Sequence, residues 1–205
     1  MRTTSNSPVL TRRRALATAA AALTVPAVAR AQPTGFDARG FPLDPAGNPI
    51  VLERRVSGFL TRDWQDHFSN RRNGVILVDT AARALHFWNE AGTIYNVYPT
   101  SVPLTPELTR TGRTRIVQKR IGPDWRPTPN MLRRNPDLPT YVGPGPQNPL
   151  GTHALYLSWT YYRIHGTNDT RKIGRKSSNG CIGLYNEQIE ELFGLARVGT
   201  QDLLI

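Results

Sequence analysis

The sequence predicts a mainly β domain with one or two short helices. Short apolar runs alternate with turn residues from about residue 73 onward, which is typical of strands joined in a meander. A proline-rich stretch over 123–149 excludes a long helix there, and one segment near the end of the chain has helical spacing of its apolar residues. At 205 residues the chain has room for one domain of ordinary size and a targeting segment.

The first 31 residues have the layout of an export signal. Arginines at 12–14 precede an alanine-rich apolar run that ends at Val28, and Ala29–Ala31 forms a small-x-small cleavage site. The apolar run, of roughly 14 residues, is too short to span a membrane. We therefore expect cleavage near Gln32 and no membrane span in the mature chain. The paired arginines are similar to the twin-arginine export motif, with Sec export and an uncleaved anchor as the alternatives.

Residues 32–72 form the second predicted segment, an N-terminal arm or linker. Proline, glycine and aspartate recur every few residues up to about residue 55, a composition typical of irregular chain. We expect the folded domain to begin at residue 73 and to continue to residue 205.

Six apolar runs in the domain predict strands. They are bounded by turn residues and contain many β-branched and aromatic side chains. Asn89–Gly92 separates the second run from the third and predicts a hairpin, so the early part should be an antiparallel meander. The runs are Val75–Val78, Ala84–Trp88, Thr93–Tyr98, Arg115–Val117, Ala154–Leu157 and Tyr161–Ile164.

Two further regions complete the expected domain. The prolines of 123–149 predict a long ordered loop, which serves as a lid or a binding wall in many domains, with a plain surface excursion as the alternative. Beyond it, Asn186 is a candidate helix N-cap, and Gly199–Thr200 predicts a turn before a closing strand at Leu203–Ile205. The predicted helix buries one apolar face, made of Ile189, Leu192, Phe193 and Ala196.

The chain is basic, with 26 Lys and Arg residues against 15 Asp and Glu residues and a net charge of +11. Five of the arginines lie in the first 31 residues, so the remainder has 21 basic and 15 acidic residues and a charge of +6. This surplus favours anionic polymers such as a cell wall, and solubility explains it equally well. No basic helix or aromatic-interleaved basic stripe occurs, and we therefore expect no nucleic-acid partner.

Cys181 is the only cysteine, so an intramolecular disulfide is impossible. A single cysteine is usually a small buried hydrophobe, but His165 stands 16 residues before this one and could take the thiol proton. Gly180 allows a tight turn that aims the amides of Gly180 and Cys181 at a developing oxyanion. The spacing alone leaves the structural and the catalytic interpretations open.

The segment His165–Thr167, followed by Ser178–Ile182, resembles the signature of the YkuD-type L,D-transpeptidases. The common form of that signature is Ser-His-Gly-Cys followed by Ile or Val and Arg. Further similarity lies in Asn148–Gly151, in Pro123–Trp125 and in Val198–Thr200, so the likeness covers about 73–205. It implies a YkuD-like β-sandwich with a catalytic loop in a cleft, and a place in the periplasm or at the cell wall.

The resemblance also implies a reaction on the tetrapeptide stems of peptidoglycan, without metal or cofactor. Cys181 would attack the carbonyl of the third stem residue and expel the terminal D-alanine, and an amine from another stem or from a protein would resolve the thioester. His165 would move the protons, oriented by the carbonyl of Gly166. The expected oxyanion and substrate-binding residues are Gly180, Ser178, Asn179, Thr167 and His153.

Two positions depart from the common signature. Asn179 stands where the family has a histidine and cannot titrate, so His165 must carry the proton transfer. Gly183 stands where an arginine usually follows, which removes a cation near the thiol and should open space. A neighbouring run is usually a solvated loop but could supply the missing cation from Arg171, Lys172, Arg175 or Lys176.

Other interpretations stay open beside the transpeptidase. The departures are compatible with a wall-binding pseudoenzyme, which the retained Cys181 and His165 argue against, and transfer to water would make the protein an L,D-carboxypeptidase. A papain-like protease is disfavoured because the histidine precedes the cysteine. His153 is a candidate for the cleft, with a hydrogen-bonded structural role as its alternative, and we expect packing or surface roles for His67 and His86.

Overall fold

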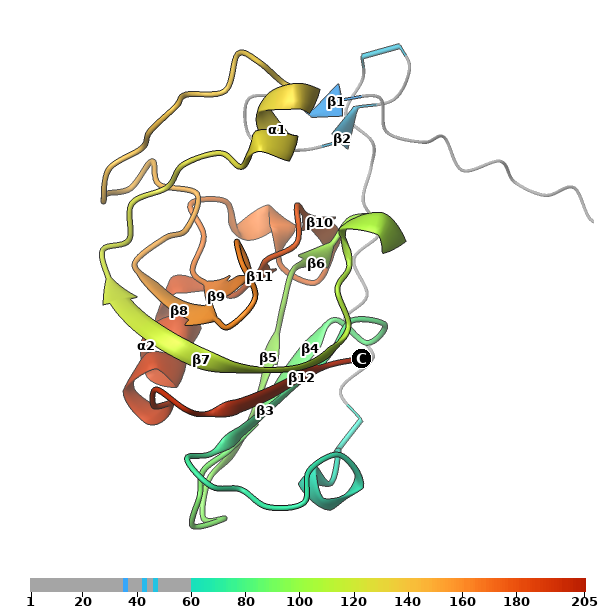
Figure 1. Cartoon of the computed structure of the whole chain (residues 1–205), viewed down its shortest axis with the longest axis vertical. Helices are drawn as coiled ribbons and strands as arrows, with labels where there is room; N and C mark the ends of the chain where they lie inside the picture. The colour runs from blue at the N-terminus through green and yellow to red at the C-terminus, as the bar shows by residue number, and fades with distance from the viewer. Residues whose placement is uncertain (1–34, 37–41, 44–45, 48–59) are drawn as a thin grey trace, which may run out of the picture. The chain divides into compact units, whose positions relative to one another are not determined.

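One continuous eight-stranded sheet dominates the computed structural model, which describes residues 35–36, 42–43, 46–47 and 60–205 (Figure 1). Its strand order is β11-β9-β8-β7-β12-β3-β4-β5, and the mainly β prediction is confirmed. The predicted export signal and most of the predicted arm lie outside the described residues. The strands of the sheet are β3 (Val75–Asp79), β4 (Ala84–Trp88), β5 (Tyr95–Pro99), β7 (Gly112–Ile121), β8 (His153–Leu157), β9 (Arg163–His165), β11 (Ile182–Gly183) and β12 (Gln201–Leu204).

The remaining elements are short. Two small strand pairs occur, one antiparallel between β1 and β2 and one parallel between β10 and β6. Among the described residues, no helix has the length and apolar character that a membrane crossing requires. These elements are β1 (Gly35–Phe36), β2 (Pro42–Leu43), β6 (Val102–Pro103), β10 (Lys176–Ser178), α1 (Pro129–Arg134), α2 (Asn186–Leu195), and the 3-10 turns η1 (Trp64–Asp66), η2 (Pro106–Leu108) and η3 (Thr170–Lys172).

The predicted meander is present as β3, β4 and β5, paired antiparallel in that order. Its second turn is the expected hairpin, in which the Gly92 amide donates to the Asn89 carbonyl at 3.1 Å. Gly92 has φ 76°, a left-handed conformation that glycine adopts without steric cost. The turn residues therefore fix the register of β4 against β5.

The closing strand β12 lies in the middle of the sheet rather than at its edge. It pairs parallel with β3 and antiparallel with β7. β7 is the longest strand, with ten residues, and it curves strongly as it passes from β12 to β8 (Figure 1). This curvature wraps one face of the sheet around the main core.

All five residues of β3 are buried because both faces of the strand are covered. Ile76 and Val78 belong to the main core, whereas Val75 and Leu77 belong to a smaller cluster on the other face. Phe68 completes that smaller cluster and is 4% exposed. Residues 60–72, expected in the arm, thus include a side chain that packs on the domain.

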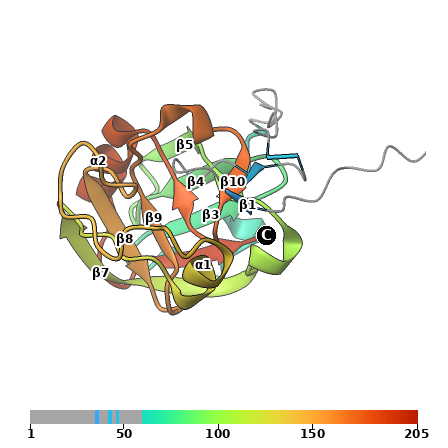
Figure 2. The same ribbon diagram turned by 90° about the horizontal axis from the view of Figure 1, so that it is seen from above.

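Helix α2 packs on β8 and β9 and closes the core on that side (Figures 1 and 2). Its predicted apolar face is confirmed, since Ile189 and Leu192 are fully buried. The N-cap prediction is wrong: the cap position is Tyr185, and Asn186 is the first helical residue. The Asn186 side chain instead bonds to the backbone of Thr167.

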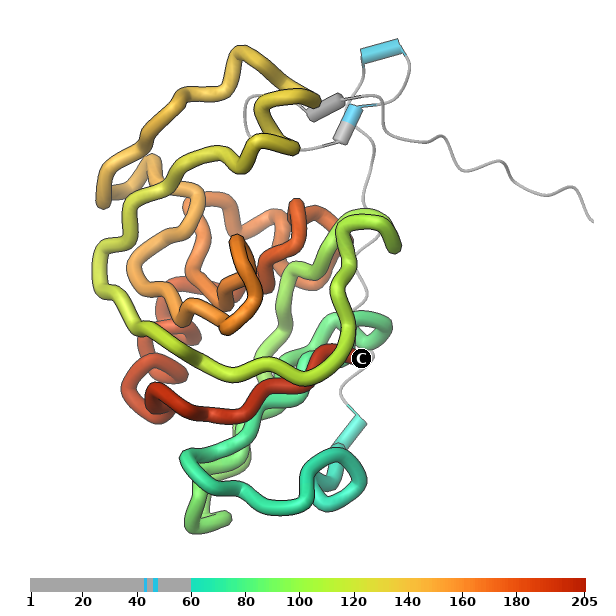
Figure 3. The backbone as a smooth tube through the Cα atoms, in the orientation of Figure 1, coloured from blue at the N-terminus to red at the C-terminus, as the bar shows by residue number. Residues whose placement is uncertain are grey.

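The proline-rich segment forms an ordered excursion between β7 and β8 (Figure 3). Its base is closed by two backbone hydrogen bonds between Trp125 and Val142, of 2.8 and 2.9 Å. It contains one short helix, α1, which begins at Pro129 and is capped by the Thr128 side chain. Proline suits the first helical turn, where its missing N–H is not needed.

Asp202 of β12 is a buried carboxyl group in an apolar environment. It is 1% exposed, and neither carboxylate oxygen has a hydrogen-bond partner. It lies on the same face of the strand as Leu204, which belongs to the main core. Burial raises the pKa of Asp202 from 3.8 to about 8, and the nearby Leu203 amide opposes this only in part.

Asp202→Asn should remove a pH dependence of stability. Between pH 4 and 8 the folded protein keeps a proton that the unfolded chain releases, so the wild-type free energy of unfolding falls by up to about 1.4 kcal/mol per pH unit from this group. Urea unfolding at pH 5, 6.5 and 8 measures it. The free energy of unfolding of Asp202→Asn should rise relative to that of the wild type as pH rises. The control variant Asp137→Asn, which changes an exposed carboxylate, should show no such relative gain. Parallel curves for wild type and Asp202→Asn would contradict the assignment.

Candidate active site

A cavity of about 610 Å³ collects most of the residues that the sequence signature predicted. Its floor is formed by β9 and the loop that leads into β11, and the proline-rich segment forms a wall. Five of the predicted site residues line it, namely Cys181, His165, Thr167, Ser178 and Asn179.

The pairing of β9 with β11 places the thiol and the imidazole on the same side of the sheet. The two strands are parallel, with Ile182 opposite Ile164 and Gly183 opposite His165. Both isoleucines are fully buried in the main core. Because side chains alternate along a strand, His165 and Cys181 face the opposite side, where the cavity lies.

The imidazole of His165 is held as a base. Its Nδ1 lies 2.5 Å from the Gly166 carbonyl oxygen, which can only accept, so Nδ1 carries the proton and Nε2 keeps its lone pair. Burial lowers the pKa of His165 from 6.5 to about 4, although the Gly166 hydrogen bond opposes this. The ring is therefore neutral at physiological pH and able to accept a proton.

The thiol of Cys181 is neutral in this arrangement. Burial raises its pKa above the ordinary value, and the charge of Arg163 opposes that effect in part. The Sγ–H donates to the carbonyl of Tyr161 at 3.3 Å rather than to the imidazole. Tyr161 has φ 68°, an uncommon conformation for a side-chain-bearing residue, which aims this carbonyl at the sulfur. Deprotonation by His165 therefore requires the thiol to leave Tyr161.

Asn186 fixes the turn that follows the histidine, and sequence reasoning missed this role. Its Oδ1 accepts the amides of Thr152 and Thr167 at 3.3 and 3.1 Å, and its Nδ2 donates to the Thr167 carbonyl at 3.0 Å. A Cβ at Gly151 or Gly166 would lie 2.2 Å from Oδ1, so the amide fits only because both residues are glycine. Gly151 and Gly166, which lie against Asn186 in the fold, were the only features of the sequence that could have indicated this role.

Gly183 does not open space beside the thiol, and that expectation is wrong. Gly183 is buried, and its amide lies 3.1 Å from Oγ of Ser101. A Cβ at position 183 would lie 2.4 Å from the same oxygen. The hydroxyl of Ser101 occupies the volume that a side chain at 183 would need. Ser101 also lines the cavity and carries no sequence signal of its own.

The basic run before the cysteine contributes two side chains to the cavity, Arg171 and Lys172, whereas Arg175 and Lys176 do not line it. Arg171 forms two hydrogen bonds with Asp169, of 2.8 and 2.7 Å. A further arginine, Arg134 of α1 in the proline-rich segment, contacts the loop before Cys181: its Nη2 donates to Oδ1 of Asn179 at 2.5 Å. This bond links the proline-rich segment directly to the loop that precedes Cys181.

Asn148 holds the proline-rich wall in place. The residue is fully buried, and its Nδ2 donates to the carbonyls of Pro123, Val142 and Gly143 at 2.7, 3.3 and 2.9 Å. Its Oδ1 accepts the Leu150 amide at 2.8 Å. One side chain thus ties both ends of the excursion together. Residues of this segment line one side of the cavity.

The other expected site residues have structural contacts. Gly180 has φ 126°, and its amide donates weakly to Ser178 Oγ at 3.4 Å, a bond that an oxyanion would have to displace. His153 is not brought to the cavity. The His153 ring packs on Phe193 of α2, and its Nδ1 lies 3.0 Å from Thr152 Oγ1. These contacts match the hydrogen-bonded structural role that was the alternative to a place in the cleft.

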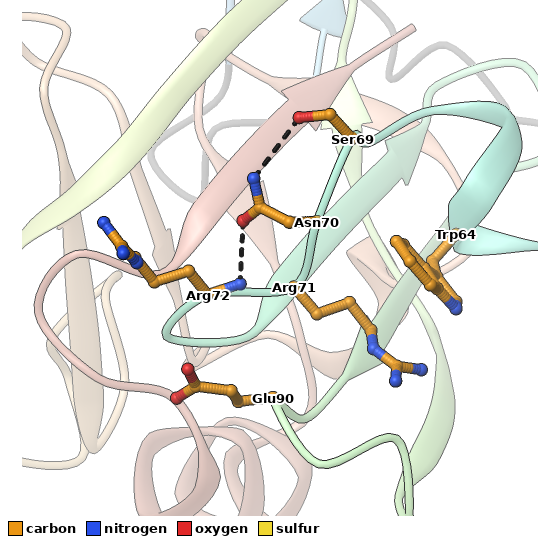
Figure 4. A pocket seen from close by; sticks show the side chains of 6 residues that line it. All are labelled: Trp64, Ser69, Asn70, Arg71, Arg72 and Glu90. Atoms are coloured by element: carbon orange, nitrogen blue, oxygen red, sulfur yellow. Dashed lines mark hydrogen bonds between the residues drawn. The ribbon is translucent and has the colours of Figure 1, made fainter.

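A second hollow of about 550 Å³ lies by the loop before β3 (Figure 4). It offers neither a thiol nor an imidazole, and Arg71 is held over the Trp64 ring at 4.4 Å. In the part of the chain that the structure describes, no three His, Cys, Asp or Glu side chains gather to bind a metal ion. The thiol-containing cavity is therefore the candidate active site. The hollow is lined by Trp64, Ser69, Asn70, Arg71, Arg72 and Glu90.

Comparison with known sequences agrees with the geometry. Residues 73–203 match the family model described as YkuD, L,D-transpeptidase catalytic domain. A Fuscovulum blasticum protein named as an L,D-transpeptidase of the ATP synthase subunits region, ORF 5, is 55% identical over 153 residues, which cover 75% of this chain and 80% of that protein. ErfK/SrfK of Escherichia coli K12, also named as an L,D-transpeptidase, is 36% identical over 139 residues, covering 65% of this chain and 44% of that protein.

Solved structures show the same fold at low sequence identity. An L,D-transpeptidase from Mycobacterium smegmatis superposes with a TM-score of 0.51 at 17% identity, over 65% of this chain and 58% of that chain. L,D-transpeptidase 3 of Mycobacterium tuberculosis, solved with a faropenem-derived adduct, gives 0.50 at 15% identity, over 64% and 60%. This chain covers less than two thirds of the length of both solved chains.

Gly183→Ala should destabilise the protein through Ser101. The new methyl group displaces the Ser101 hydroxyl and costs about 1–2 kcal/mol in the free energy of unfolding. Ser101→Ala removes the obstructing oxygen, and the Gly183 amide keeps its bond to the Ser101 carbonyl at 3.1 Å. The double variant should therefore be more stable than Gly183→Ala alone in urea unfolding. Strict additivity of the two changes would show that the residues do not compete for space.

Proposed function

Because the chain belongs to the YkuD family of L,D-transpeptidase catalytic domains, which act on peptidoglycan peptides, we propose that it remodels peptidoglycan through a cysteine acyl-enzyme. One observation carries the proposal: His165 at the end of β9 and Cys181 just before β11 line one cavity, and the hydrogen bond to Gly166 leaves Nε2 of the imidazole as a base. The metal-free chemistry of a thiol and an imidazole suffices for acyl transfer.

The first half-reaction forms a thioester on Cys181. Nε2 of His165 takes the proton of Sγ, and the thiolate attacks the carbonyl carbon of the third stem residue. The tetrahedral intermediate then expels the terminal D-alanine, whose amine nitrogen receives the proton from Nε2. The Gly166 carbonyl stabilises the transient imidazolium, because Nδ1–H donates to it throughout.

The second half-reaction releases the acyl group to an amine. The acceptor nitrogen attacks the thioester carbonyl and loses a proton to Nε2 of His165, which returns it to the departing sulfur of Cys181. The acceptor is the diamino acid of another stem or an amine of a protein. Attack by water would give the carboxypeptidase reaction at the same site.

The reacting pair becomes charged only by a proton transfer within the site. The pKa of the thiol lies above its ordinary value and that of the imidazole lies near 4, so the pair rests as neutral thiol and neutral base. Such a pair must exchange a proton before it reacts, and His165 is the partner able to take it.

Faropenem should acylate Cys181, and intact-protein mass spectrometry of residues 32–205 should detect the adduct. Cys181→Ala should show no mass increase. His165→Gln should slow adduct formation by about 100-fold or more, because glutamine is similar in size to histidine but cannot accept the thiol proton. His153→Gln is the matched control and should react at the wild-type rate, since that ring lies outside the cavity. An unmodified wild type that still binds peptidoglycan would support the pseudoenzyme instead.

We also propose export to the periplasm or cell wall by the twin-arginine route, on the basis of the sequence of residues 1–31. A reporter that becomes active only after export in the folded state, fused behind residues 1–35, should be exported. Replacing Arg12 and Arg13 by lysine should reduce export several-fold in cell fractionation, because the motif depends on the paired arginines. Unchanged export of the lysine variant would indicate the Sec route.

A further inference from the structure

The candidate cavity is strongly cationic. Arg171 is bound to the single carboxylate among the residues that line it, and the reacting thiol and imidazole are both neutral at rest. A ligand that enters this cavity therefore meets positive charge that the lining residues do not balance. The charged lining residues are Arg126, Arg134, Arg163, Arg171, Lys172 and Asp169.

Arg163 lies beside the reacting pair in the strand register. It lies on β9 two residues before His165, so both side chains project from the same face of the strand. Parallel pairing places Cys181, which directly precedes β11, beside Arg163, because Ile182 is opposite Ile164. The positive charge of Arg163 accordingly acts to lower the pKa of both the Cys181 thiol and the His165 imidazole.

The guanidinium of Arg163 is positioned but not fully satisfied. It lies over the ring of Tyr156, its cross-strand neighbour, at 5.0 Å from the ring centre. Its Nε is buried and has no hydrogen-bond partner. Because Arg163 lines the cavity while its Nε is closed to solvent, the terminal NH2 groups of the guanidinium are the donors available to a ligand. The planar guanidinium donates in pairs, and a carboxylate is the group that matches this geometry.

The proposed function indicates which carboxylate this is. The amine of the leaving residue must sit at Nε2 of His165 to receive its proton, and the carboxylate of a terminal residue is two bonds from that nitrogen. Resting on the proposed function, we propose that Arg163 binds the terminal carboxylate of the leaving residue and thereby restricts the donor to peptides that end at that residue. Arg163 is then a specificity-determining residue for the first half-reaction.

A pair of synthetic donors tests this role. One is a tetrapeptide stem with a free terminal carboxylate, and the other is the same stem with a terminal carboxamide. Wild type should prefer the free acid by about 10- to 100-fold in kcat/KM, the range expected for a lost charge-assisted hydrogen bond. Arg163→Gln should bring the ratio of kcat/KM for the free acid to that for the carboxamide close to one, whereas Arg163→Lys should retain part of the preference. Loss of the Arg163 charge near Cys181 and His165 changes both kcat/KM values together and leaves this ratio unaffected.

Three controls make the result specific. Arg120→Gln changes an exposed arginine on β7 that pairs with Asp124 outside the cavity, and it should keep the wild-type preference. Alkylation of Cys181 by neutral iodoacetamide reports thiol reactivity without a carboxylate, and thermal unfolding reports the fold. If the wild type uses both donors equally, the inference about Arg163 is overturned while the proposed function stands, and this measurement needs no variant. An equal loss with both donors in Arg163→Gln would also overturn it, and no turnover of either donor by wild type would overturn the proposed function as well.

Discussion

The parallel pairing of β9 with β11 is the constraint on which the candidate site depends. Ile164 and Ile182 are held side by side in the core, and each stabilises the fold by about 1.5–3 kcal/mol through burial. Because both are fixed inward, the residues next to them in sequence must face the cavity, and His165 and Cys181 are brought together without any direct bond between them. The reactive groups are thus positioned by apolar packing on the far side of the same two strands.

Two asparagines, Asn148 and Asn186, extend that control to the irregular parts of the chain. Asn148 ties the ends of the proline-rich wall together, and Asn186 holds the turn that presents the Gly166 carbonyl to His165. Backbone groups in such turns cannot pair with a strand, and each would cost about 1–3 kcal/mol if buried without a partner. A primary amide offers donors and an acceptor at once, so one side chain satisfies several of these groups.

Much of the fold was predictable because local patterns agree with the final structure. Strand runs, the hairpin glycine and the apolar face of α2 all express local preferences that the core preserves. Cys181 and His165 were found through their signature. Ser101, Arg163 and Asn186 were missed because their roles depend on contacts between distant segments, and Gly183 was misjudged because its neighbour is 82 residues away. The central place of β12 was likewise invisible, since pairing partners are set by topology rather than by composition.

The central place of β12 has a consequence for biosynthesis. This strand is translated after every other strand of the sheet, yet it joins β3 to β7. Until residues 201–204 emerge from the ribosome, the chain holds two half-sheets, each with an unpaired backbone edge that could associate with another nascent copy. Completion of the sheet is therefore a late, long-range event, and such contacts slow folding. A chaperone that shields these edges during synthesis would protect the protein at the stage when it is most prone to aggregate.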